Sequence, residues 1–250
     1  MHYGICPLSV VPIRSTPDDI EEMISQLLYG EHFKILEQRK YWSRIRMAFD
    51  NFEGWVDNQQ ITTIDEEDYQ KLENSSNFKY SSDLVAYVSG SSGTLLPIVL
   101  GSSVQDFKAL PYTFEGTSVT VKSDKSNLLK IALLYLNSPF LFGGRTPFGI
   151  DSSGFTQMVY KINGHTLKRS ASEQSTQGEA LSFIEESEPG DLAFFDNKEG
   201  SIDHVGIIMK DNFIIHAFGK VRIDRLDHTG IFNAQTRNYT HSLRVIKKMI

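Results

Sequence analysis

The chain has 250 residues and a mass of 28.3 kDa, and with 40% hydrophobic and 22% charged residues it can bury a core and is not expected to be disordered. Its net charge of −6 argues against binding to a nucleic-acid backbone, and its single cysteine excludes a disulfide framework and a cysteine-rich zinc site. No apolar run reaches the roughly 18 residues of a membrane span, and the first residues do not resemble a secretory signal, so we expect a cytoplasmic protein, or a periplasmic or secreted one if a signal was removed.

The N-terminal half is typical of small β domains. Short apolar runs with polar turns, as in 41–61, predict a small barrel over residues 1–61. Residues 17–28 start with a proline and an acidic run, which predicts either a helix start or a long acidic loop. Further short apolar runs predict a second small β domain, or a linker, over residues 62–122; they lie at 84–89, 95–100 and 117–122.

From residue 123 the pattern changes to helices followed by strands. A Leu-rich segment at 123–139 and a run with helical apolar spacing at 155–164 predict helices, and residues 170–181 predict the start of a third. The strands expected after them, separated by short turns, are 191–196, 204–209, 213–218, 220–226 and 243–248. This order is typical of an α+β domain, which we place at 123–250.

Residues 141–157 (LFGGRTPFGIDSSGFTQ) form the densest unusual segment. A glycine-rich loop leads through Asp151, Ser152 and Ser153 into the helix that follows. A side chain at a helix N-terminus lies beside unsatisfied N–H groups and the positive end of the helix dipole, which favours a nucleophile and an oxyanion. The alternative is an ordinary capping loop without chemistry.

Two histidines add to this pattern. In an antiparallel hairpin that turns near residue 210, His204 and His216 are expected to lie nearly opposite each other, so that one acts as a base and the other orients it. Two unrelated histidines are the first alternative. A metal site is the second, but no third ligand has convincing spacing, so we expect no metal and no cofactor.

At this point the motifs resemble a known family. FGGRTPFGIDSSGFTQMVY (142–160), PGDLAFFD (189–196) and the two histidine strands are similar, in this order, to the NlpC/p60 cell-wall peptidases, which are papain-like cysteine enzymes. The two upstream segments resemble bacterial SH3 (SH3b) domains. Together they resemble the γ-D-glutamyl-L-diamino acid endopeptidases, or dipeptidyl-peptidases VI, which cut the γ-D-Glu–diamino acid bond of murein stem peptides with a free N-terminal L-Ala.

The resemblance implies a nucleophilic cysteine where this chain has Ser152. We interpret the serine as an inactivating replacement, either introduced to retain an uncleaved ligand or natural. In the natural case the chain would be a peptide-binding pseudo-enzyme or a weak serine hydrolase; an SH3b wall-targeting module is a further alternative. Cys6 lacks the helix-start context and is interpreted as a buried or incidental thiol.

The resemblance also implies roles for other residues. Residue 152, His204 and His216 would form the catalytic triad, and Asp151 and Ser153 would bind the amino end of the substrate. Further substrate-binding candidates are Glu31, which would contact the free amine, Trp55 and Phe140; Trp55 could instead belong to the barrel core and Glu31 to a solvated turn. Arg145 could hold a substrate carboxylate or form a surface salt bridge. We expect a monomer whose partners are murein peptides, without nucleic-acid or membrane partners.

Overall fold

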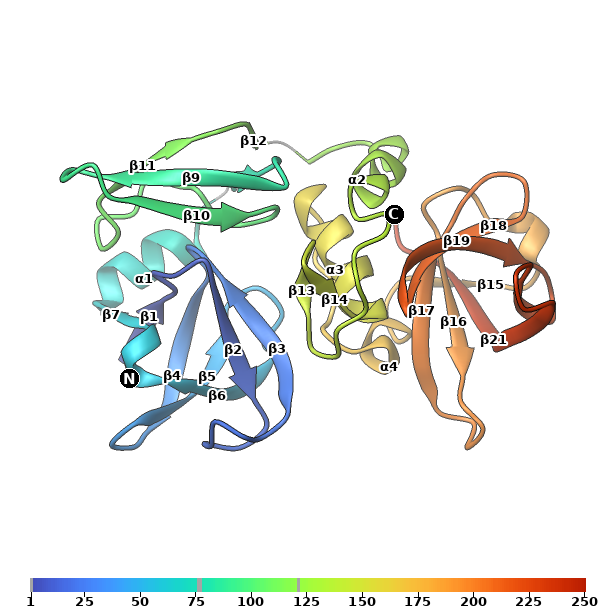
Figure 1. Cartoon of the computed structure of the whole chain (residues 1–250), viewed down its shortest axis with the longest axis horizontal. Coiled ribbons are helices and arrows are strands. Elements are labelled where there is room, and N and C mark those ends of the chain that lie inside the picture. Colours follow the sequence, from blue (N-terminus) through green and yellow to red (C-terminus); the bar gives the residue numbers. More distant parts are fainter. Residues whose placement is uncertain (1, 76–77, 121) are drawn as a thin grey trace. The chain divides into compact units, whose positions relative to one another are not determined.

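The computed structural model describes residues 2–75, 78–120 and 122–250 (Figure 1). The chain divides into two compact units, one formed by Met1–Lys122 with Phe142–Pro147 and the other by Ser123–Leu141 with Phe148–Ile250. We call them the N-terminal and the C-terminal unit. Within the described residues, no helix has both the length and the apolar character needed to cross a bilayer.

The main feature of the N-terminal unit is an antiparallel sheet of seven strands in the order β3-β2-β6-β5-β4-β1-β7. In β5 the buried Ser43, Ile45 and Met47 alternate with exposed arginines, as expected for a strand with one face on a core. Cys6 is fully buried in this core. The strands are β1 (His2–Ile5), β2 (Val10–Arg14), β3 (Met23–Leu28), β4 (His32–Gln38), β5 (Trp42–Met47), β6 (Glu53–Asp57) and β7 (Thr62–Ile64).

Of the two alternatives for residues 17–28, the helix is wrong, because the acidic run is a loop that leads into β3. The rest of this unit holds the helix α1 (Glu66–Glu73), capped by Asp65, and two small sheets around a second core. Within the expected run 117–122 the structure contains a two-residue strand, and Val121 lies outside the described residues. The elements are η1 (Asn58–Gln60), β8 (Tyr80–Ser81), β9 (Val85–Gly90), β10 (Leu95–Val99), β11 (Tyr112–Glu115), β12 (Ser118–Val119) and β13 (Arg145–Thr146).

Helices form the first half of the C-terminal unit. The helix expected at 123–139 is shorter than predicted, because Tyr135 caps it and Asn137 adopts a left-handed φ of 70°. By contrast α3 begins three residues earlier than expected, so that residues 152–154 belong to the helix. The elements are η2 (Lys125–Asn127), α2 (Leu128–Leu134), β14 (Gly149–Ile150), α3 (Ser152–Ile162), α4 (Ala171–Gln174) and η3 (Ile184–Glu186).

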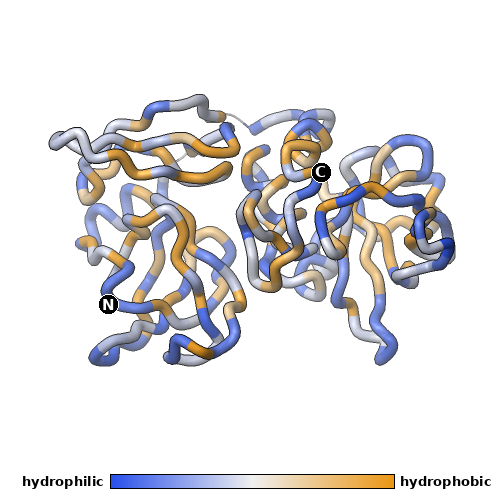
Figure 2. The backbone as a smooth tube through the Cα atoms, viewed as in Figure 1, coloured by the Kyte–Doolittle hydropathy of each residue, from blue (hydrophilic) through white to orange (hydrophobic). Residues whose placement is uncertain are grey.

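The second half is an antiparallel sheet in the order β15-β21-β16-β17-β18-β19-β20. Because β20 also pairs with β21, six of its strands close into a barrel (Figure 1). Apolar residues concentrate along the strands and hydrophilic residues in the turns (Figure 2), and α3 packs against β17 and β18. The strands are β15 (Glu179–Leu181), β16 (Leu192–Asp196), β17 (Ile202–Ile208), β18 (Phe213–Phe218), β19 (Lys220–Leu226), β20 (Gly230–Asn233) and β21 (Asn238–Lys248). The C-terminal unit has the α+β arrangement that the sequence predicts, and the N-terminal unit consists mainly of strands, as predicted.

Candidate active site

The N-terminus of α3 carries Ser152 at its first helical position. Asp151 is the N-cap residue, and its Oδ1 accepts a hydrogen bond of 2.6 Å from the backbone N–H of Gly154. The N–H groups of the first turn have no partner four residues earlier in the helix, and they lie at the positive end of the dipole. Ser152 therefore lies where a helix stabilises an attacking anion and the oxyanion that it generates.

A buried arginine holds the cap in place. Arg169 forms a two-point ion pair with Asp151, with Nη1 3.0 Å from Oδ1 and Nη2 2.6 Å from Oδ2. The Ser153 hydroxyl joins them, because it donates to Asp151 and accepts from Arg169 at 3.0 Å. Both oxygens of Asp151 thus already have cationic partners, and a substrate ammonium would be an additional one. The predicted binding roles of Asp151 and Ser153 stay predictions.

The sheet brings the two histidines together, but not as expected. Gly206 pairs with His216 in the β17–β18 hairpin, so His204 lies two residues further along and contacts His216 diagonally. The difference arises because the turn runs through Asp211 and Asn212, both with positive φ, which places its centre at 211 instead of 210. Gly206 has no side chain, which leaves room for the ring of His216 to reach His204.

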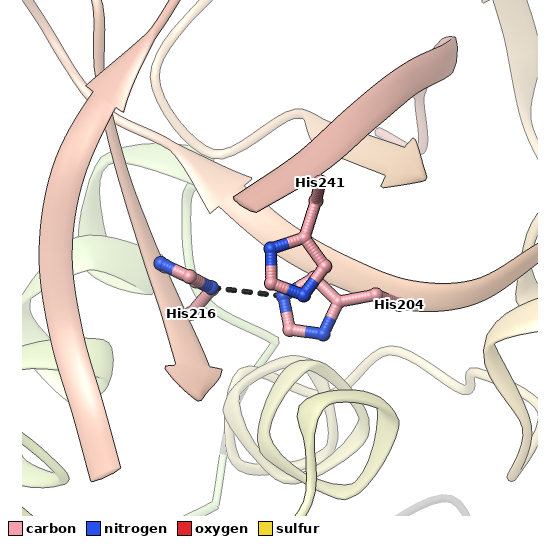
Figure 3. Close-up of side chains that lie close together, drawn as sticks. All are labelled: His204, His216 and His241. Atoms are coloured by element: carbon pink, nitrogen blue, oxygen red, sulfur yellow. Dashed lines mark hydrogen bonds between the residues drawn. The ribbon is translucent and has the colours of Figure 1, made fainter. Parts of the chain in front are cut away.

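A hydrogen-bonded chain runs across three neighbouring strands. His204 Nε2 lies 2.8 Å from His216 Nδ1 (Figure 3). The other nitrogen of His216 lies 3.1 Å from Asp224 Oδ2 on β19. Arg222, two residues before Asp224, donates to its Oδ1 at 3.0 Å. Neither Asp224 nor Arg222 was a candidate from the sequence; the signal that could have found them is a pair of opposite charges at alternate positions of the strand after His216.

Burial keeps this chain of groups in defined charge states. Burial lowers the pKa of His204 well below its usual value, and the neighbouring His216 and His241 lower it further. Burial also lowers the pKa of His216, against the opposing effect of Asp224. Burial raises the pKa of Asp224, but hydrogen bonds from His216 and Arg222 outweigh it, so the carboxyl pKa is lower than usual. At neutral pH the geometry therefore presents two neutral imidazoles and one carboxylate.

A third histidine, His241 on β21, joins the cluster. One nitrogen from each of His204, His216 and His241 lies within 4.8 Å of the others. Zinc–nitrogen bonds of about 2.0–2.1 Å would place tetrahedral ligand atoms about 3.3 Å apart with converging lone pairs. Here the rings of His204 and His241 stack nearly parallel, with centroids 3.9 Å apart (Figure 3), so their lone pairs do not converge. The arrangement is that of a hydrogen-bonded and stacked cluster, and the absence of a metal site stays a prediction.

Replacement of Gly206 with alanine is expected to destabilise the chain by about 1–3 kcal/mol. The added methyl would lie 2.7 Å from Ile214 Cδ1 and 2.9 Å from His216 Cβ, so the hairpin has to shift. Urea unfolding checks this. In the control Gly200→Ala the methyl meets nothing within 4 Å, and only backbone strain of about 1 kcal/mol remains. Equal costs for the two variants would contradict the packing argument.

Glu31 and Arg145, two predicted substrate-binding residues, form a buried ion pair in the N-terminal unit. Arg145 Nη1 and Nη2 lie 2.8 and 2.9 Å from the two carboxylate oxygens, and the side chains of Arg145 and Glu31 are 0% and 4% exposed. Arg145 also donates to the backbone carbonyl of Gln26, and Glu31 accepts from the N–H of Leu28. The pair secures the turn between β3 and β4. A ligand group that used either side chain would have to compete with this pairing, and both binding roles stay predictions.

The replacement Arg145→Met is expected to destabilise the chain by about 3–5 kcal/mol, because it leaves the Glu31 carboxylate buried without its cation. The exposed pair of Arg46 and Glu53 offers a matched control, and Arg46→Met should cost less than about 1 kcal/mol. Chemical unfolding of both variants measures the difference. A loss of less than 1 kcal/mol in Arg145→Met would show that the pair contributes no more than a surface ion pair.

The other two predicted binding residues differ in exposure. Trp55, on β6, is 8% exposed, and the guanidinium of Arg39 lies over its ring at 4.4 Å. Phe140 is 43% exposed, and its N–H donates to the carbonyl of Gly219, directly after β18. Phe140 is thus free to contact a ligand, whereas Trp55 is largely covered; their binding roles also stay predictions.

Two families and several known proteins are similar to this chain. Residues 137–240 match the NlpC/P60 family, and residues 13–61 match the bacterial dipeptidyl-peptidase Sh3 domain. The chain is similar to the γ-D-glutamyl-L-lysine dipeptidyl-peptidase of Bacillus subtilis, with 24% identity over 77% of this chain and 71% of that protein. It is also similar to dipeptidyl-peptidase 6 of Lysinibacillus sphaericus, with 23% identity over 84% of this chain and 87% of that protein. A Bacillus cereus NlpC/P60 family protein has the same fold, with a TM-score of 0.82, 18% identity and 99% of both chains covered.

Proposed function

Because the chain belongs to the NlpC/P60 family of cysteine-type peptidases and carries a bacterial dipeptidyl-peptidase SH3 domain, we propose that its site is built to hydrolyse the γ-D-Glu–L-diamino acid bond of murein peptides. The proposal includes release of the dipeptide L-Ala-D-Glu from peptides with a free amino end. It also includes a serine at the nucleophile position that leaves this chain inactive or very slow. The observation that carries the proposal is the row of hydrogen-bonded side chains from His204 through His216 to Asp224. The helix α3 packs against the strands of both histidines, and residue 152 lies at the start of this helix.

In the proposed reaction each group has one role. A nucleophile at position 152 attacks the scissile carbonyl carbon while His204 accepts its proton. The backbone N–H groups at the start of α3 donate to the oxyanion that forms. The tetrahedral intermediate collapses, the carbon–nitrogen bond breaks, and His204 returns the proton to the leaving amine. Water, deprotonated by His204, then hydrolyses the acyl intermediate and releases the dipeptide.

Ser152 limits the first of these steps. A thiol has an ordinary pKa of about 8.5, whereas a hydroxyl holds its proton far more tightly and needs a strong general base. The lowered pKa of His204, which burial causes, makes it a weak base. The same imidazole is sufficient for a thiol at a helix N-terminus. The site therefore suits sulfur better than oxygen.

The experiment determines which bond is cut. The variant Ser152→Cys is incubated with L-Ala-γ-D-Glu-L-Lys and, separately, with the diaminopimelate tripeptide, and the products are identified by mass spectrometry. We expect L-Ala-D-Glu and the free diamino acid. N-acetylation of the L-Ala should suppress cleavage, because the proposal requires a free amine. Cleavage at another bond, or equal cleavage of the acetylated peptide, would overturn the proposed specificity.

A second candidate function is retention of murein peptides without cleavage, and Ser152 itself favours it. Calorimetric titration of the Ser152 protein with the same tripeptide separates the two. Binding to the Ser152 protein together with cleavage by Ser152→Cys supports the peptidase. Binding by both proteins without cleavage supports a binding protein and overturns the peptidase.

A further inference from the structure

Asp224 and Arg222 extend the chain of polar groups beyond the two histidines. Both come from β19, the strand next to β18, and Asp224 faces His216 diagonally, as His216 faces His204. The Arg222 side chain is 18% exposed, whereas that of Asp224 is 5% exposed, and Arg222 Nε lies 2.6 Å from Asp224 Oδ2. His204, His216 and Asp224 lie at the end of the sheet face that carries Ile208, Ile214 and Leu226 of the barrel core. A charged side chain in such a place needs a function or a full set of partners.

The hydrogen-bond chemistry of these groups determines where the protons lie. An ionised carboxylate only accepts hydrogen bonds, so His216 must carry its proton on Nε2, which faces Asp224. A neutral imidazole has one protonated nitrogen, so His216 Nδ1 is an acceptor and His204 must donate to it from Nε2. The lone pair of His204 is then on Nδ1, the nitrogen directed away from His216 (Figure 3).

We propose that Asp224 is a positioning residue which, through His216, holds His204 in the tautomer that has its basic lone pair on Nδ1. As a role in the reaction, this inference rests on the proposed peptidase function, in which His204 accepts the proton of the nucleophile. As a statement about protons, it concerns this chain in its Ser152 form and does not depend on any cleavage.

Arg222 makes the inference testable with a single substitution. Arg222 contacts both oxygens of Asp224, but only its contact from Nη2 to Oδ1 has the geometry of a hydrogen bond. In Asp224→Asn we expect the amide oxygen to stay in the Oδ1 position as the acceptor for Nη2. The amide NH2 then takes the Oδ2 position toward His216 Nε2, and Arg222 Nε has to move away from it. His216 must then accept on Nε2 and donate from Nδ1 to His204 Nε2. His204 in turn carries its proton on Nδ1 and loses the lone pair that the reaction needs. One atom changed on β19 thus reverses both tautomers.

The first measurement uses the Ser152 protein labelled with ¹⁵N. Long-range ¹H–¹⁵N correlation spectra distinguish a protonated from an unprotonated ring nitrogen for each histidine. We expect Nε2–H for His204 and His216 in the parent protein and Nδ1–H for both in Asp224→Asn. The control Asp203→Asn removes an exposed carboxylate directly before His204 and should leave both tautomers unchanged. If Asp224→Asn retains Nε2–H on both rings, the inference is overturned.

The second measurement uses the Ser152→Cys background. Asp224→Asn should lower kcat at least about 10²-fold with little change in KM, whereas Asp224→Glu, which restores a carboxylate, should recover part of the loss. A loss of activity without a switch of tautomers would show a merely structural role and overturn the inference. If Ser152→Cys cleaves nothing while the tautomers switch as expected, the proposed function fails but the proton arrangement stands.

Discussion

Replacement of Ser152 with cysteine is expected to raise kcat/KM for L-Ala-γ-D-Glu-L-Lys at least about 10³-fold above that of the Ser152 protein. The substitution changes one atom at nearly constant shape, in a residue that is 5% exposed at the first position of α3. Unsatisfied N–H groups at this position lower the pKa of a thiol, so that it gives up its proton to a general base more readily than the hydroxyl of Ser152 does. A steady-state assay of dipeptide release measures both proteins.

The matched control is Ser172→Cys, which adds a thiol at an exposed position of α4. It should stay as slow as the Ser152 protein, because its thiol is exposed and does not stand at the start of α3. If the Ser152 protein itself is as fast as Ser152→Cys, the serine is a competent nucleophile. The inactivating role proposed for it would then be wrong.

The second large effect concerns the base. In the Ser152→Cys background, His204→Ala is expected to lower kcat about 10³- to 10⁴-fold, with KM within a few-fold of its previous value. The imidazole both accepts the proton of the thiol and protonates the leaving amine, and a hydrogen bond of 2.8 Å to His216 holds it in place. Initial rates over a range of tripeptide concentrations separate kcat from KM.

His228→Ala serves as the control, because His228 lies exposed in the turn after β19. It should leave kcat and KM unchanged. If His204→Ala retains more than a tenth of the activity, another group supplies the proton transfer. His241, whose ring stacks on His204, would be the first to examine, although burial lowers its pKa to about 4.

Local patterns were sufficient for much of the architecture, although they placed the start of α3 three residues too late. Buried and exposed residues alternate in β5, and apolar residues from Phe155 onward recur at helical spacing. Both patterns can be recognised in a short segment without the rest of the chain. The cap at Asp151 is equally local, because it depends on a side chain three residues before the N–H that it accepts.

What escaped prediction depends on pairing between distant segments. His241 comes from β21 and contacts His204 of β17 because both strands pair with β16, which no spacing in the sequence indicates. Arg169 approaches Asp151 from a loop eighteen residues away. The diagonal contact between His204 and His216 depends on where the β17–β18 hairpin turns. The centre of this turn lies one residue later than expected, and this difference pairs His216 with Gly206 instead of His204.

The turn at Asp211 and Asn212 has a consequence for how this family of sequences can vary in length. Exposed turns are usually where insertions and deletions are tolerated most easily. Here a deletion of one residue would slide β18 against β17 and carry His216 to the opposite face of the sheet, away from both His204 and Asp224. We therefore expect related chains that keep the hydrolytic chemistry to preserve the length of this turn, and chains whose turn is one residue shorter to have lost the chemistry.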